Sequence, residues 1–191
     1  MSKTTSVETP RDKKPTNFHH TYLTCFQKEV KSWVEYNFGK SDRHKPHQHL
    51  LGMIEEIYEL ESANTEDEKL DSIGDIMVYM ADYCNCVNIP LESLYRIGRS
   101  PTRVVVPVYD HRKLLITLGI LCKLQLKQEQ NIRYSGSTID ARRWVALQII
   151  MEYCRMKAKS LDVGFIAIIE RVWSAVKERD WTKNRIDGSR K

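Results

Sequence analysis

The spacing of apolar residues along this chain of 191 residues predicts an all-helical protein. Apolar side chains recur at helical intervals over 18–38, twice within 50–83, and again over 111–128, 139–159 and 162–180. The two helices within 50–83 are separated near Asn64 to Asp67. Asn88 and Pro90 are typical of the start of a short helix over 91–97. The pattern therefore predicts one all-α domain over residues 18–191.

Three segments lack this spacing. Residues 1–17 are polar and contain two prolines, and we expect a flexible tail there. Residues 98–110 contain two prolines and consecutive valines, which favour an extended connector between an N-terminal half (18–97) and a C-terminal half (111–185). The segment 39–49 reads as a loop with His44, His47 and His49. A zinc site is one interpretation of these histidines, but no cysteine lies nearby, and we favour solvated loop side chains.

Composition narrows the class of protein. Hydrophobic residues make up 41% of the chain and charged residues 29%, and no apolar run is long enough to span a bilayer. The five cysteines and the absence of a signal segment predict a reduced, cytoplasmic protein. Cys84 and Cys86 point to different helix faces, so we expect core packing rather than metal or redox use. The net charge of +5 is spread along the chain, which argues against dedicated nucleic-acid binding and suits an anionic small substrate.

Acidic side chains gather on the two helices within 50–83. Glu55, Glu56 and Glu59 share an arc of the first helix, and Asp71 and Asp75 lie one turn apart on the second. Carboxylates that crowded repel one another unless they bind divalent cations or have raised pKa values, and hard oxygen ligands suit Mg²⁺ or Mn²⁺. A solvated acidic face is the alternative. The apolar surroundings of the aspartates favour a site, because buried acids are costly unless satisfied.

The C-terminal half contains a degenerate copy of the N-terminal half. Asp82-Tyr83-Cys84 matches Glu152-Tyr153-Cys154 and Leu91-Glu92 matches Leu161-Asp162, each 70 residues apart, and Leu51-Gly52 matches Leu118-Gly119. The second copy has lost every proposed ligand. Asp82 lies on the face of Asp71 and Asp75, but its counterpart Glu152 persists in the copy without a site. We therefore interpret Asp82 as structural, or as a residue that orients ligands.

Three stretches carry a resemblance to a family: LLGMIEEIYELESA, LDSIGDIMVYMADYCN and VWSAVKERDWTKN. They resemble the MazG-like branch of the all-α nucleoside triphosphate pyrophosphohydrolases, over most of the chain. In that family an E-E-x-x-E helix and an E-x-x-D helix bind Mg²⁺, and a metal-activated water cleaves the triphosphate between the α and β phosphates. Glu55, Glu56 and Glu59 match the first motif, and Asp75 matches the aspartate of the second. Ser72 stands where the family has glutamate, and Asp71 is the candidate substitute.

The resemblance and the residues together assign roles. Glu56, Glu59, Asp75 and Asp71 are the candidate metal ligands, and Glu55 is a further ligand or, with Glu56, a catalytic residue that acts on water. The candidate phosphate-binding cations are Lys183, Arg185, Lys127 and Arg133, for which solvation in a basic segment is the alternative. Trp33, Phe38 or Trp181 would stack on a base, although aromatic residues at helical spacing are usually core.

The resemblance also implies an architecture and a function. We expect a helical bundle of two tandem, pseudo-two-fold related copies with one active site per chain, which is compatible with a homodimer. The implied reaction is Mg²⁺-dependent hydrolysis of (deoxy)nucleoside triphosphates to the monophosphate and pyrophosphate, in nucleotide-pool cleansing or control. The alternative is a catalytically weak MazG-like protein that binds nucleotides or a partner.

Overall fold

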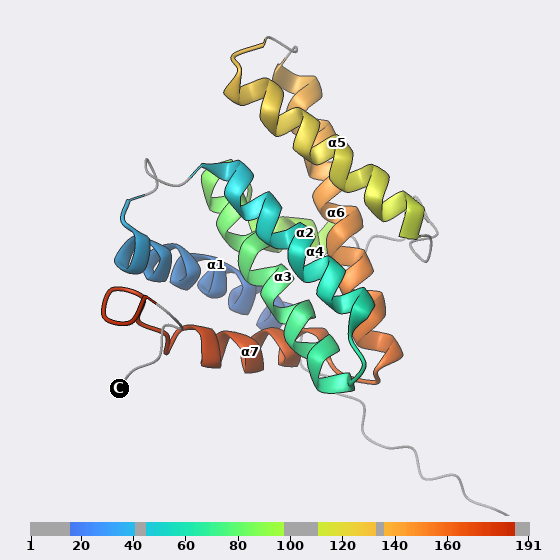
Figure 1. Ribbon diagram of the computed structural model, residues 1–191. Coiled ribbons are helices and arrows are strands. Elements are labelled where there is room, and N and C mark those ends of the chain that lie inside the picture. The colour runs from blue at the N-terminus through green and yellow to red at the C-terminus, as the bar shows by residue number, and fades with distance from the viewer. Residues whose placement is uncertain (1–15, 41–44, 98–110, 133–135, 186–191) are drawn as a thin grey trace, which may run out of the picture.

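The computed structural model describes residues 16–40, 45–97, 111–132 and 136–185, and every regular element in these ranges is an α-helix (Figure 1). The helices are α1 (Thr16–Phe38), α2 (Pro46–Ser62), α3 (Glu66–Cys86), α4 (Leu91–Ile97), α5 (His111–Glu129), α6 (Gly136–Ser160) and α7 (Phe165–Val176). The predicted all-α class is confirmed. Residues 1–15 of the predicted tail and all of the predicted connector at 98–110 lie outside the described residues.

Helices α2 and α3 form a tight hairpin with clear local signals. Thr65 caps α3, since its Oγ1 accepts a hydrogen bond from the Glu68 amide at 3.2 Å, while the Glu68 carboxylate accepts one from the Thr65 amide at 3.0 Å. The two helices approach closely at Gly52, where an added Cβ would overlap the ring of Tyr79. The acidic faces predicted on these helices are therefore held side by side.

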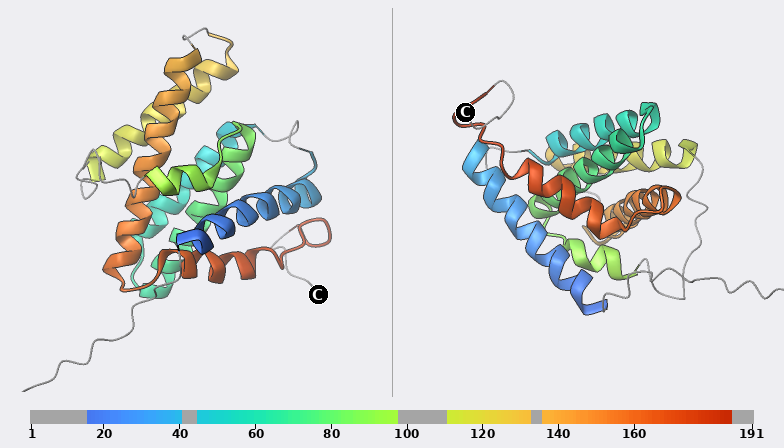
Figure 2. Two further views of the ribbon diagram at one scale, coloured as in Figure 1. Left: turned by 180° about the vertical axis from the view of Figure 1, so that it is seen from behind. Right: turned by 90° about the horizontal axis from the view of Figure 1, so that it is seen from below.

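Helix α3 is the centre of the core. Its apolar positions Ile73, Ile76, Met77 and Met80 are fully buried, and it packs against α1, α2, α6 and α7. A Cβ at Gly74 would overlap Val172, so this glycine permits the close approach of α7. Figure 2 shows α1 and α7 running beside α3, and side chains of α1 and α7 also meet. The end of α7 is thereby brought next to the acidic hairpin.

Helices α5 and α6 form a second hairpin; the end where α5 stops and α6 begins extends beyond the other helices in Figures 1 and 2, while α6 also packs against α3, α4 and α7. Arg143 of α6 is only 2% exposed, and its Nε donates to the Tyr83 hydroxyl of α3 at 3.1 Å. The Tyr83 hydroxyl donates in turn to Gln125 of α5 at 3.1 Å, and other Arg143 nitrogens donate to Gln128 and Asp140. A satisfied polar network thus joins the two halves of the chain.

The turns that follow the two hairpins have the same backbone geometry. Asn88 and Asp162 both adopt a left-handed conformation, with φ of 57° and 54°. The Ile89 amide donates to the Cys84 carbonyl at 2.9 Å, and the Val163 amide donates to the Ala158 carbonyl at 3.2 Å, which is a Schellman cap in each case. These caps place Asp162 opposite Asn88 rather than opposite Glu92, so α6 runs about one turn further than the sequence match implied.

Inside the helices the burial pattern still follows the predicted spacing of 70 residues. The positions that are buried in both α3 and α6 at this spacing are Ile73 and Arg143, Ile76 and Ala146, Met77 and Leu147, Met80 and Ile150, Ala81 and Met151, Tyr83 and Tyr153, and Cys84 and Cys154. The pseudo-two-fold relation of the two halves stays a prediction.

Several predicted boundaries were wrong. Helix α1 begins at Thr16, inside the predicted tail, and α6 begins at Gly136. Helix α2 begins at Pro46, so His47 and His49 are helical rather than part of a loop. Helix α7 ends at Val176, and turns follow where helix was predicted to continue to 180. In the part of the chain that the structure describes, no helix has the length and apolarity needed to cross a membrane.

Candidate active site

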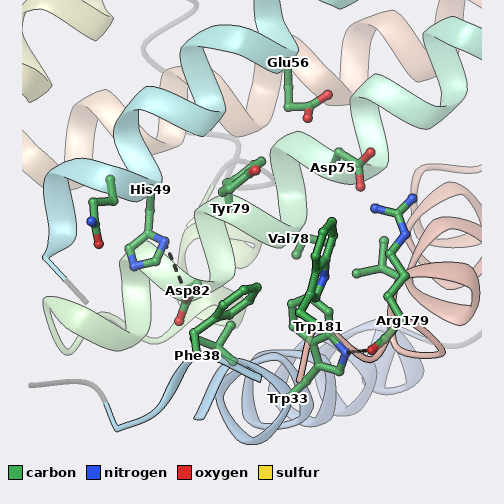
Figure 3. A pocket seen from close by; sticks show the side chains of 13 residues that line it. Trp33, Phe38, His49, Glu56, Asp75, Val78, Tyr79, Asp82, Arg179 and Trp181 are labelled. Carbon is green, nitrogen blue, oxygen red and sulfur yellow. Dashed lines mark hydrogen bonds and ion pairs between the residues drawn. The ribbon is translucent and has the colours of Figure 1, made fainter. Parts of the chain in front are cut away.

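A cavity of about 440 Å³ lies where α2, α3, the end of α1 and the turns after α7 meet. Glu56 of α2 and Asp75 of α3 line one end of it (Figure 3). Arg179 approaches Asp75 from the turn after α7, and Trp181 lies beside Arg179. Carboxylates, a guanidinium and aromatic rings from distant parts of the sequence therefore converge on one space. Its volume is in the range that holds small ligands.

Glu56 is in an environment that disfavours its ionised form. Burial, together with the negative charges of Asp75, Glu59 and Glu55, raises the pKa of Glu56 to about 8, while Arg179 opposes this shift. A surface glutamate would be fully ionised near neutral pH. Glu56 is therefore an acid whose charge the fold leaves without full compensation, a common property of functional sites.

Asp75 shows the same effect more weakly. Burial raises the pKa of Asp75 to about 6, with Arg179 lowering it and the charges of Asp71 and Glu59 raising it. Glu59 thus acts on both cavity carboxylates although it is itself exposed. The acids of the two helices are therefore close enough to influence one another, and their role as ligands of one ion stays a prediction.

The donor set fits a hard divalent cation, because it consists of carboxylates whose mutual repulsion a cation would relieve. In the described residues, however, the acids of α2 and α3 do not form a set of three ligand atoms within 4.8 Å of one another. This acidic group (Glu55, Glu56, Glu59, Asp71 and Asp75) is close in space but does not form a closed coordination sphere, so metal binding would require side-chain rotation.

The second motif deviates from the pattern of the resembled family at Ser72, for which Asp71 is the candidate substitute. Ser72 is buried, and its hydroxyl donates to the Glu68 carbonyl at 3.1 Å, so it offers no ligand to the cavity. Asp71, the candidate substitute, is exposed and accepts a hydrogen bond from Arg171 of α7 at 3.2 Å. Asp71 is therefore at the margin of the acidic group, where it affects Asp75 while paired with a cation.

Arg179 is the cavity cation that sequence reasoning missed. Lys183 lies 3.3 Å from Asp180 and is not part of the cavity lining, and neither are Arg185 and Lys127. Arg133 lies outside the described residues. Arg179 belongs to the stretch VKERDWTKN, which is part of the resemblance. Only the chain reversal after Val176, however, brings the Arg179 side chain to the acids.

The turn that carries Arg179 is held by Asp180. Its carboxylate accepts hydrogen bonds from the amide and the hydroxyl of Thr182, at 3.2 and 2.6 Å. The Thr182 hydrogen bond and Lys183 lower the pKa of Asp180 to about 2. The Trp181 amide also donates to Asn37 of α1 at 2.7 Å. These contacts hold the segment that places Arg179 and Trp181 in the cavity lining.

The three aromatic residues proposed for base stacking all line the cavity. Trp33 and Phe38 lie edge to face with centroids 5.7 Å apart, and Phe38 is 6.3 Å from Trp181. Phe38 is 45% exposed, so its ring is available to a ligand rather than enclosed in the core. The cavity is therefore lined by aromatic rings as well as by the carboxylates.

Two histidines of the predicted loop have specific partners. The Nδ1 atom of His47 lies within hydrogen-bonding distance, 2.8 Å, of a carboxylate oxygen of Glu129 in α5. His49 is buried, and its Nδ1 lies 3.2 Å from Asp82 of α3, which is buried too. The interpretation as a solvated side chain was therefore wrong for His49, whereas the His47 side chain stays 43% exposed although it pairs with Glu129. The interpretation of Asp82 as structural stays a prediction. His44 lies outside the described residues. Cys84 is in the core, as predicted, while Cys86 is half-buried.

No protein family model, curated protein or solved structure matches this chain. The resemblance to the MazG-like proteins accordingly remains one of motifs, and the site rests on the geometry described above.

Proposed function

We propose that this chain is a Mg²⁺-dependent nucleoside triphosphate pyrophosphohydrolase of the MazG-like type, acting on (deoxy)nucleoside triphosphates. The observation that carries the proposal is one cavity lined by Glu56 and Asp75 at one end, by Arg179 beside them, and by the aromatic rings of α1 and Trp181. Such a cavity suits a ligand that carries both a polyphosphate and a flat base.

Each group has a role in the proposal. Glu56, Glu59 and Asp75 would hold the cation, with Asp71 at the margin and Glu55 orienting water. A bound Mg²⁺ neutralises phosphate oxygens and lowers the pKa of water. Arg179 would donate forked hydrogen bonds to phosphate oxygens. The position of cleavage, between the α and β phosphates, follows from the motif resemblance.

The test is a screen of ordinary and damaged NTPs and dNTPs with Mg²⁺, in which pyrophosphate and monophosphate are measured together. We expect Glu59→Ala to lower kcat/KM by about 100-fold or more, because a metal ligand contributes several kcal/mol of transition-state stabilisation. Glu66→Gln, at an exposed acid in the first turn of α3, is the matched control and should retain full turnover. Full turnover in Glu59→Ala would contradict the mechanism even if the wild type is active.

A second function has a specific observation in its favour. Because Ser72 is buried and Asp71 is paired with Arg171, the second motif offers fewer free carboxylates than the resembled family has. A catalytically weak protein that binds nucleotides or a partner would show this loss. Nucleotide binding without pyrophosphate release in the same screen would favour it.

The proposal extends to the architecture. The two hairpins would be tandem, pseudo-two-fold related copies in one bundle, with the acidic site only in the first. The C-terminal copy would then act as scaffold within the chain, and light scattering would show whether a homodimer forms as well. A cytoplasmic location and a role in nucleotide-pool cleansing belong to the same proposal.

A further inference from the structure

A second cluster of metal-binding side chains lies about two helical turns from the acidic group. One ligand atom each from His49, Asp82 and Cys86 lie within 4.8 Å of one another. In the described residues no other trio of histidine, cysteine or acidic side chains is this compact. Asp82 is seven residues from Asp75 along α3, or about 10 Å at the rise of an α-helix. The two clusters are therefore separate.

The fold explains why these three residues meet. Asp82 and Cys86 are four residues apart on α3, so their side chains lie on one face. His49 is in the first turns of α2, which pairs with α3 as a hairpin. Two ligands one turn apart on one helix and a third from its partner helix is an arrangement that rigid elements hold well.

The chemistry of the trio differs from that of the acidic group. An imidazole, a carboxylate and a thiol are the ligand types that Zn²⁺ and its tetrahedral substitute Co²⁺ bind, whereas Mg²⁺ takes oxygen ligands. Tetrahedral zinc ligands are about 3.5 Å apart, given metal–ligand distances near 2.0–2.3 Å. Small rotations of three side chains that already lie within 4.8 Å would bring them to that spacing.

A metal ion could reach the cluster through two cavities. His49 and Asp82 line the cavity of the candidate active site, and Asp82 and Cys86 line a second cavity of about 170 Å³ beside α1. Three protein ligands with a further position open to a cavity are typical of zinc sites that exchange a ligand.

The alternative is a purely structural role, in which Asp82 only stabilises His49. Their contact of 3.2 Å is sufficient for a buried ion pair or hydrogen bond, and this pair would not require a thiol. The pair alone does not explain why Cys86 lies on the same face of α3 as Asp82.

We propose that His49, Asp82 and Cys86 form a binding site for a zinc-type divalent cation, between the start of α2 and the end of α3. The site is independent of the proposed hydrolase, since it shares no ligand with the acidic group.

The test uses the full chain, reduced and stripped of metal with a chelator, and titrated with Co²⁺ in the absence of nucleotide. We expect saturable binding with a near-ultraviolet thiolate-to-cobalt charge-transfer band, which Zn²⁺ abolishes by displacement. Cys86→Ser should lose this band and bind at least about tenfold more weakly. Cys25→Ser, at an exposed cysteine of α1, is the matched control and should retain both.

Folding is checked separately. Circular dichroism should give the same helix content for Cys86→Ser as for the wild type, and Zn²⁺ should raise the Tm of the wild type but not of this variant. Asp82→Asn tests the carboxylate with a side chain of the same shape, and Glu59→Ala should keep the cobalt band. The absence of the band in the wild type, or its persistence in Cys86→Ser, would overturn the proposal.

Discussion

The two helical hairpins share an architecture and differ in how they treat their polar residues. In α2 and α3, Glu56 and Asp75 are partly buried beside other acids, and the pKa of each carboxyl is raised. In α5 and α6, the buried guanidinium of Arg143 donates to Tyr83, Gln128 and Asp140. Buried charge that its partners satisfy, as at Arg143, holds the fold together, whereas buried charge that its neighbours compensate only in part, as at Glu56 and Asp75, identifies a candidate site.

The largest expected effect comes from removing a carboxylate in the N-terminal hairpin. Asp75→Asn should lower kcat by about 100- to 1000-fold, because it removes a charged group proposed to touch the cation. Pyrophosphate release under saturating nucleotide measures this effect. Asp67→Asn, at an exposed aspartate of α3 that pairs with Arg171 of α7, is the control and should change turnover little. Equal losses in both variants would mean that the charge of α3, not the site, is what matters.

The next effect concerns the C-terminal hairpin and falls on stability. Arg143→Ala should lower the free energy of unfolding by about 3 kcal/mol, because it empties a buried volume and leaves polar partners without their donor. Urea unfolding followed by circular dichroism measures the loss. Arg142→Ala, at the exposed neighbour, should stay within about 0.5 kcal/mol of the wild type. Turnover per folded molecule should persist in Arg143→Ala, and its loss would show that the second hairpin contributes to the site.

The sequence predicted the helices well because apolar spacing is a local signal. It misplaced helix ends where a single residue determines the boundary. Pro46 starts α2 inside a run of polar residues that was interpreted as a loop, and this error hid His49. Helix α7 stops early because the turn around Asp180 is held by side-chain hydrogen bonds to Thr182. Neither of these helix boundaries is visible in the spacing of apolar residues.

The acidic half of the site was predictable and the basic half was not. Glu56 and Asp75 belong to motifs with fixed spacing on adjacent helices, so their proximity follows from a single hairpin. Arg179 reaches them only because α7 packs on Gly74 and the chain then turns back. Asp71 pairs with Arg171, which is 100 residues away in sequence. Contacts over such separations depend on packing, which one sequence does not reveal.

The smallest expected effect is on pH dependence and follows from the sign of one shift. The pKa of Glu56 is raised from 4.5 to about 8, so between these values the folded chain holds a proton that the unfolded chain releases. Stability must then fall as pH rises through this range, and above it the penalty is constant. Glu56→Gln cannot ionise. In the presence of a chelator, the free energy of unfolding of this variant at pH 8 should be higher than that of the wild type by roughly 1–2 kcal/mol, after allowance for solvent screening. Near pH 4 the two free energies should be equal.

Mg²⁺ distinguishes this prediction from a simple gain of stability in the variant. If the acids of α2 and α3 bind a cation, Mg²⁺ should raise the Tm of the wild type at pH 8 more than that of Glu56→Gln, since the cation relieves the repulsion that the variant lacks. Arg142→Ala should respond to Mg²⁺ as the wild type does. A wild type whose unfolding is insensitive to both pH and Mg²⁺ over this range would mean that Glu56 is as well compensated as Arg143. The difference between the two hairpins would then carry no information about function.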